Sequence, residues 1–131
     1  NSLVGIHFMY ILLTLLFICH WLGDFSFLST PTMLDAKATG SPWFPIFVHA
    51  CVHGTLMALV LYFFTEAVVL LQLVLFQIST HFMIDALKGK MNIWFPKIND
   101  PTQQLYWVVF GLDQLMHHLV ILAMVHEVSP V

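Results

Sequence analysis

The chain has 131 residues, of which 60% are hydrophobic and only 8% are charged, and its mean hydropathy is +0.88. Soluble domains carry about a quarter charged residues. This composition therefore excludes a soluble monomer, a disordered tail and a nucleic-acid-binding protein, which needs a basic surface. The chain nevertheless holds eight histidines beside only four lysines, and a purely lipid-facing segment has no use for so many ionisable rings.

Four long apolar stretches divide the chain, and each reaches the length of about 20 residues that a helix needs to cross a bilayer. They predict helices at Leu3–Phe25, Trp43–Phe64, Ala67–Leu87 and Gln104–Glu127. The second and third helices are so close in sequence that we expect a tight antiparallel hairpin. The sequence thus predicts an all-α polytopic membrane protein embedded in the lipid bilayer. Residues 1–131 would form one domain, an antiparallel up-down bundle of four transmembrane helices.

The first predicted connection, residues 26–42, contains several residues that favour turns. Pro31 and Gly40 are among them, and they flank Lys37. We interpret these residues as turn-formers that end one helix and prepare the next. In that interpretation the connection acts as a lid over a functional site at this end of the bundle.

The lysines indicate how the bundle is oriented. All of them fall in or beside the two connections on one side of an up-down bundle, namely Lys37, Lys88, Lys90 and Lys97. Because lysine and arginine mark cytoplasmic connections, that side is predicted to face the cytoplasm. We therefore expect a multi-pass membrane protein with both termini on the side opposite to the cytoplasm.

Each predicted helix carries one pair of ionisable residues four positions apart, which puts both side chains on one helix face. The pairs are His20 and Asp24, His49 and His53, His81 and Asp85, and Asp113 and His117. In an alternating bundle all eight residues fall in the cytoplasmic half of the membrane. We therefore expect these eight side chains to converge.

The chemistry of these eight residues predicts a divalent metal site. A charged aspartate near the bilayer centre costs at least ~2.5–3.5 kcal/mol, so three of them need partners. Five imidazoles and three carboxylates without a thiolate suit Zn(II), with Mn(II) or Fe(II) as alternatives. A dry hydrogen-bonded network or a proton relay is a competing interpretation. Haem held by two histidines is another, but haem leaves the three carboxylates unexplained.

Two functional hypotheses follow from a metal site in this place. In the first, a metal-activated water attacks a lipid-borne phosphoester, and Asp24 or Asp113 takes the proton of that water. Lys88 follows Asp85 by one helical turn and either extends to the headgroups or holds an anionic group of the substrate. In the second hypothesis the chain is a non-catalytic accessory subunit of a larger membrane complex. Its His/Asp cluster is then a structural metal site, a hydrogen-bond network or a proton relay.

The order of the motifs resembles a known family. The segments that carry the resemblance are His-Trp-Leu-Gly-Asp-Phe at 20–25, His49 with His53, His-Phe-Met-Ile-Asp-Ala-Leu-Lys at 81–88, and Asp113 and Gln114 with His117. Together they resemble a bacterial integral-membrane family catalogued as domain-of-unknown-function family 3307, over nearly the whole chain. The resemblance implies a multi-pass protein of the bacterial inner membrane, whose termini would then lie in the periplasm. More distantly, the His/Asp pairs are similar to those of membrane-bound metal-dependent hydrolases. That second resemblance implies a metal-activated water attacking a phosphoester.

Overall fold

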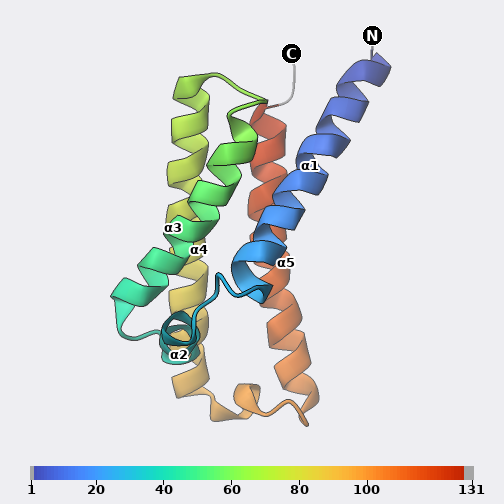
Figure 1. Ribbon diagram of the computed structural model, residues 1–131. Helices are drawn as coiled ribbons and strands as arrows, with labels where there is room; N and C mark the ends of the chain where they lie inside the picture. Colours follow the sequence, from blue (N-terminus) through green and yellow to red (C-terminus); the bar gives the residue numbers. More distant parts are fainter. Residues whose placement is uncertain (1, 129–131) are drawn as a thin grey trace.

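The computed structural model describes residues 2–128, and these residues form helices and no strand (Figure 1). The elements are α1 (Ser2–Phe25), α2 (Pro31–Thr39), α3 (Trp43–Leu61), α4 (Ala67–Trp94), the 3-10 helix η1 (Pro96–Asn99) and α5 (Gln104–Val128). Four of them, α1, α3, α4 and α5, are long and apolar enough to cross a membrane. The predicted all-α class is confirmed, and α1 and α5 begin and end within one residue of their predicted bounds.

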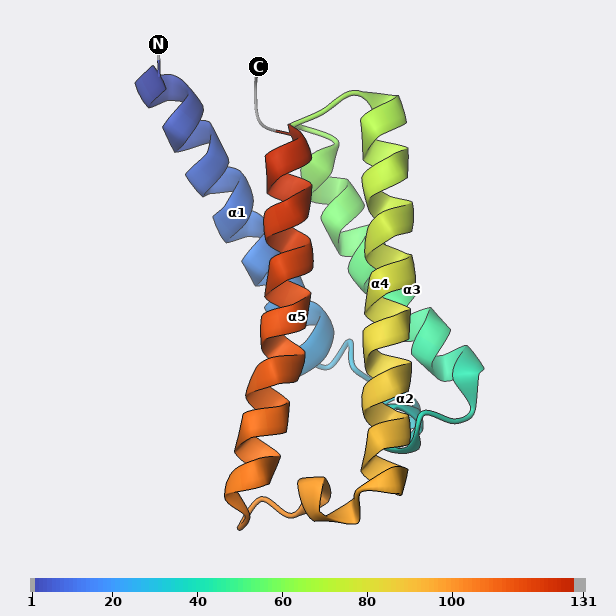
Figure 2. The same ribbon diagram turned by 180° about the vertical axis from the view of Figure 1, so that it is seen from behind.

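The two ends of the molecule differ in what they contain. The start of α1 and the end of α5 lie at one end, while α2 and η1 lie at the other (Figure 1). Seen from behind, α4 and α5 are the nearer helices, and η1 lies in the connection between them (Figure 2). Near its start, α1 leans away from the other helices in both views.

The interior of the bundle is divided into an apolar half and a polar half. Buried apolar side chains fill the half nearer the end of α5: Leu12, Leu16, Cys19, Met57, Leu61, Leu73, Ile121, Met124 and Val125. Ionisable side chains fill the other half, beginning with His20 directly after Cys19 on α1. Large apolar side chains also cover the outside, for example Leu59 and Leu71. Helices that are apolar all round are typical of an apolar surrounding.

The first connection contains a short helix that the sequence pattern did not predict. The Thr30 hydroxyl accepts a hydrogen bond from the Met33 N–H, Pro31 opens the helix, and Gly40 ends it with φ of 69°. These residues are favourable at the N-cap, first-turn and C-cap positions. The interpretation of the connection as turns alone is therefore wrong, because Pro31 and Gly40 are the two ends of α2.

Two other helix ends differ from the prediction. The third helix, α3, ends at Leu61, about one turn early, whereas α4 continues past Leu87 to Trp94. The extension of α4 contains Gly89, where a Cβ would lie 2.2 Å from the backbone nitrogen of Gly40. The glycine thus allows α2 to pack directly on α4 and does not end the helix.

Candidate functional site

The four predicted pairs meet in the polar half of the bundle. Each of the four long helices contributes one pair, and the members are His20, Asp24, His49, His53, His81, Asp85, Asp113 and His117. All are buried except Asp113, which is half-buried. The structure thus brings together every residue that the spacing singled out. We refer to these eight residues as the His/Asp cluster.

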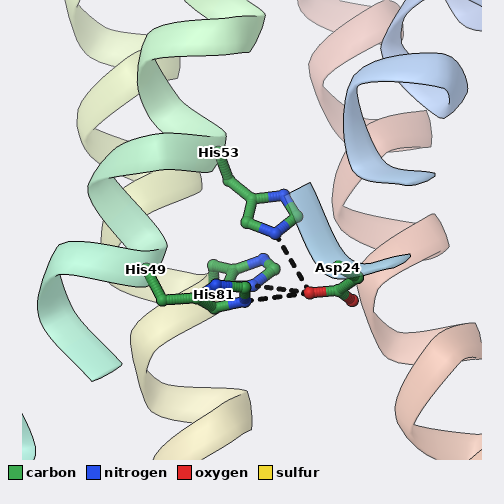
Figure 3. A group of neighbouring side chains, drawn as sticks. All are labelled: Asp24, His49, His53 and His81. Atoms are coloured by element: carbon green, nitrogen blue, oxygen red, sulfur yellow. Dashed lines mark hydrogen bonds and ion pairs between the residues drawn. The ribbon is translucent and has the colours of Figure 1, made fainter. Parts of the chain in front are cut away.

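One oxygen of Asp24 is the point on which much of the cluster converges. Asp24 Oδ1 lies 2.9 Å from His49 Nε2, 3.0 Å from His53 Nε2 and 3.7 Å from His81 Nε2 (Figure 3). Lys37 Nζ approaches the same oxygen to 3.2 Å. A carboxylate oxygen has about two lone pairs for hydrogen bonds. Four nitrogen atoms therefore compete for an acceptor that satisfies two.

Asp85 forms a second centre of contacts in the cluster. Its Oδ2 lies 3.2 Å from His81 Nε2 and 3.3 Å from Lys37 Nζ. Its Oδ1 lies 3.3 Å from His117 Nε2. The same nitrogen of His81 also faces Asp24, so this imidazole connects the two carboxylates.

On α5, Asp113 belongs to the cluster, and its neighbour Gln114 contacts two of the cluster residues. Gln114 donates from Nε2 to Asp113 Oδ2 at 3.1 Å, and His20 Nε2 lies 3.0 Å from Gln114 Oε1. Asp113 Oδ1 lies 3.8 Å from His117 Nε2 and makes no hydrogen bond to any residue within 2–128. Gln114 thus orients His20, while Asp113 keeps one oxygen free.

The side chain of Lys37 contacts members of the cluster, although the sequence pattern placed this residue in a connection interpreted as a lid. It lies on α2 and contacts Asp24, Asp85 and the Nε2 atom of His49. Burial opposes the charge of this ammonium, but the carboxylates of Asp85 and Asp24 outweigh burial and raise the pKa of Lys37 above its ordinary value. The side chain therefore stays charged and supplies the cluster with a cation of its own.

The polar face of α4 extends beyond the predicted pair. The side-chain amide of Gln77 lies 3.4 Å from His81 Nδ1, one turn before the pair. At the other end, Asn92 donates from Nδ2 to the carbonyl of Ala38 at 3.1 Å and so ties α4 to α2. Gln77 lies four positions before His81, and Asn92 lies four positions after Lys88. Helical periodicity applied to polar residues would have found them.

Close packing fixes one imidazole of the cluster. Gly23 on α1 lies against His53 of α3, and a Cβ at Gly23 would be 2.4 Å from the Cε1 and Nε2 atoms of the ring. Any larger residue at this position must displace His53. The ring of His81 is stacked on the ring of His53, with their centroids 3.8 Å apart.

The donor atoms of the cluster fall into groups that suit a metal ion. Atoms of Asp24, His49, His53 and His81 lie within 4.8 Å of one another, and so do atoms of Asp85, Asp113 and His117. A third group, His20, His81 and His117, shares one imidazole with each of these two. In a tetrahedral zinc site with bonds of about 2.0–2.1 Å, neighbouring ligand atoms are ~3.4 Å apart. The separations of 2.9–3.7 Å around Asp24 Oδ1 bracket that value.

Unpartnered polar atoms support the same interpretation. His81 Nε2, Asp85 Oδ2 and Asp113 Oδ1 are buried without a well-oriented hydrogen bond to the residues described. Buried polar atoms in folded proteins nearly always have such a partner. A cation shared by these nitrogen and oxygen atoms would satisfy them.

A polar cavity of about 210 Å³ adjoins the cluster on the side of α2. All three residues predicted to act in catalysis line it, namely Asp24, Lys88 and Asp113. Lys88 Nζ donates to Asn92 Oδ1 at 2.8 Å. A small polar group in this cavity would thus lie beside the cluster and within reach of a lysine.

Comparison with known proteins places the chain in a family. Neither a curated protein nor a solved structure matches it, so the more distant similarity to metal-dependent hydrolases stays a prediction. The sequence profile of one family, described as "Protein of unknown function (DUF3307)", matches residues 12–131. This range includes the whole His/Asp cluster, and the resemblance drawn from the motifs is confirmed. The chain belongs to the DUF3307 family.

Proposed function

We propose that this protein crosses the bacterial inner membrane with α1, α3, α4 and α5 as an antiparallel up-down bundle. Their most apolar 18-residue windows have mean hydropathies of 1.7–2.1. All lysines lie on α2, the end of α4 and η1, which favours the cytoplasm for that end of the molecule and the periplasm for both termini. Exposed tryptophans gather there too, as expected at a lipid headgroup level: Trp43, Trp94 and Trp107.

Within this bundle we propose a divalent metal site, Zn(II) in the first place, that activates water for hydrolysis of a lipid-borne phosphoester. The observation that carries the proposal is the convergence of three overlapping donor groups in one cluster beside a polar cavity. A bound zinc ion lowers the pKa of its water to about 7, which supplies hydroxide at neutral pH. The imidazole and carboxylate donors fit Zn(II), while Mn(II) and Fe(II) are the alternatives.

Access and contacts suggest different roles for the carboxylates. Asp24 faces three imidazoles through one oxygen, which suits a ligand of the same ion. Asp113 lines the cavity with an unpartnered oxygen, which suits the base that takes the proton of the water. Lys88, in the same cavity, would hold the phosphate group. Lys37 and a metal ion compete for Asp24 and Asp85, so an ion in the Asp24 group would weaken the Lys37 contacts.

Metal analysis tests this proposal directly. The protein purified in detergent without chelator should contain at least one equivalent of zinc by mass spectrometry of the elements. His81→Ala and Asp85→Ala should lose most of it, because both residues lie in the cluster. His7→Ala should retain it, because His7 is exposed and contacts only the Leu3 carbonyl among the residues described. A wild-type protein that is purified without metal and whose stability is unaffected by chelator would contradict the proposal.

One observation favours the non-catalytic alternative. The Lys37 ammonium lies within 3.3 Å of both Asp24 and Asp85 and balances part of their charge within the fold. This suits a charged hydrogen-bonded network or proton relay in an accessory subunit. In addition, the Nδ1 atoms of His20, His49 and His53 have no hydrogen-bond partner among residues 2–128, whereas ligand imidazoles usually donate their second N–H, so this feature argues against a metal held by these three rings. The metal-free outcome of the experiment above would support this alternative.

A further inference from the structure

An apolar groove runs along the outside of the bundle between α4 and α5. It has a volume of about 190 Å³, and its apolar lining consists of Ile84, Leu87, Met91, Val109, Leu112 and Met116. These two helices are the nearer ones in Figure 2. In the proposed membrane location, the groove faces lipid chains.

Two residues belong to this groove and to the polar cavity inside the bundle. Lys88 and Asp113 line both. Their side chains thus form the boundary between an apolar space outside and a polar space inside. A molecule with an apolar chain and a polar head could occupy both spaces at once, with its polar head at this boundary.

Of the two boundary residues, Asp113 is acidic and Lys88 is the one that offers a positive charge to a phosphate. Lys37 is engaged by Asp24 and Asp85. Lys88 donates to the neutral amide of Asn92 and forms no ion pair with any residue that the structure describes. Its charge is therefore available for an anion, and lysine is a common partner of phosphate groups.

The depth of the boundary matches a phospholipid that enters from the side. Lys88 lies about 9 Å along α4 from the exposed Trp94, at ~1.5 Å per residue. Tryptophan marks the headgroup level in membrane proteins, and a lysine side chain extends from such a depth towards the headgroups. Beyond Lys88 the groove continues along α4 to Ile84, towards the proposed membrane interior.

We propose that the α4–α5 groove holds one acyl chain of a membrane phospholipid, whose phosphate reaches the polar cavity sideways between the two helices and meets Lys88. This inference rests on the proposed function and names the substrate class of the same site. The apolar groove, its continuity with the cavity and the available ammonium point to a lipid phosphate, not to free phosphate. Recognition thus needs both parts of the lipid.

Binding measured by native mass spectrometry in neutral detergent tests the inference. The full chain should retain one phosphatidylglycerol. It should retain neither diacylglycerol, which lacks the phosphate, nor glycerol phosphate, which lacks the chains. Lys88→Gln should weaken retention of phosphatidylglycerol about tenfold or more, because a hydrogen bond to a charged group is lost. Lys88→Arg should keep it, and Lys90→Gln on the same helix is the matched control.

The groove is tested separately. Val109→Trp should fill it and prevent retention of the lipid, whereas Val108→Trp, at the adjacent and 57% exposed position outside the groove lining, should not. Equal retention of phosphatidylglycerol and diacylglycerol, or unchanged retention by Lys88→Gln or Val109→Trp, would overturn the inference. Because binding and not turnover is measured, a metal-free protein that retains lipid contradicts only the hydrolase. A metal-loaded protein that retains none contradicts only the lipid site.

Discussion

Gly89 of α4 and Gly40 at the end of α2 approach each other so closely that a Cβ on Gly89 would lie 2.2 Å from the Gly40 nitrogen. The same Cβ would lie 2.5 Å from the carbonyl oxygen of Lys37. This contact therefore sets how far the Lys37 side chain extends into the bundle. Asn92, which donates to the Ala38 carbonyl, holds the two helices together beside it.

Gly89→Ala should push α2 away from α4 and destabilise the fold. We expect a loss of about 1–3 kcal/mol, as for other overpacked sites, because the obstructing atoms are backbone atoms. Thermal unfolding in detergent measures the change. The control is Gly111→Ala on α5, where an added Cβ meets nothing within 4 Å and helix propensity favours alanine. Equal melting temperatures for the two variants would contradict the packing argument.

Gly23→Ala should lower the metal content without unfolding the protein, because the new Cβ displaces the His53 imidazole. Zinc bound per chain is the measurement. Gly54→Ala is the matched control, since the atoms nearest to its Cβ would belong to the side chains of Ile78 and Val74, which are outside the cluster. Retention of full zinc by Gly23→Ala would show that His53 is not a ligand.

Lys37→Met should make the stability of the protein depend more strongly on zinc than that of the wild type. Removing one partner of a buried ion pair leaves its carboxylates unpaired, and we expect a loss of about 2–4 kcal/mol in chelator because Lys37 is partly exposed. Added zinc should restore the melting temperature by supplying the missing positive charge. Lys97→Met, at an exposed lysine of η1, is the control. A destabilised variant that zinc does not rescue would favour the hydrogen-bonded network.

Asp113→Asn should abolish hydrolysis and retain metal. The amide cannot accept the proton of a metal-bound water, and loss of a general base typically costs about 100- to 10,000-fold in rate. Release of the headgroup from a fluorogenic phospholipid, measured beside zinc content, separates the two effects. Asp100→Asn, at an exposed position in the connection before α5, should leave both unchanged. A variant that loses zinc and activity together would make Asp113 a ligand.

The convergence of the cluster was predictable from two properties of the sequence. The spacing of four residues puts each pair on one helix face, and the alternating direction of the helices puts all four pairs at one end of the bundle. His81 and Asp85 share a face of α4 whatever the helix packs against. Membership of the cluster then depends only on the depth of each pair. Both conditions can be derived from residue numbers alone.

The place of α2 was not predictable in the same way. Thr30, Pro31 and Gly40 are recognisable capping residues once a helix is suspected, but the same residues also suit a loop. Only the tertiary contact of Gly40 with Gly89 distinguishes the two, because it shows why α4 continues through a glycine. The contacts of Lys37 with Asp24 and Asp85 depend on that packing and therefore cannot be predicted from the sequence.

The order of synthesis gives the convergence on Asp24 a further meaning. Asp24 lies on α1 with His20, 3.4 Å away, but its other partners come from α2, α3 and α4, and the last of these is His81. A growing chain therefore holds this carboxylate without its full set of partners until residue 81 has been made. An unpaired aspartate costs at least ~2.5–3.5 kcal/mol in a bilayer. If α1 crosses the membrane as proposed, this cost would oppose its insertion until α4 is present, and assembly of the bundle would be cooperative.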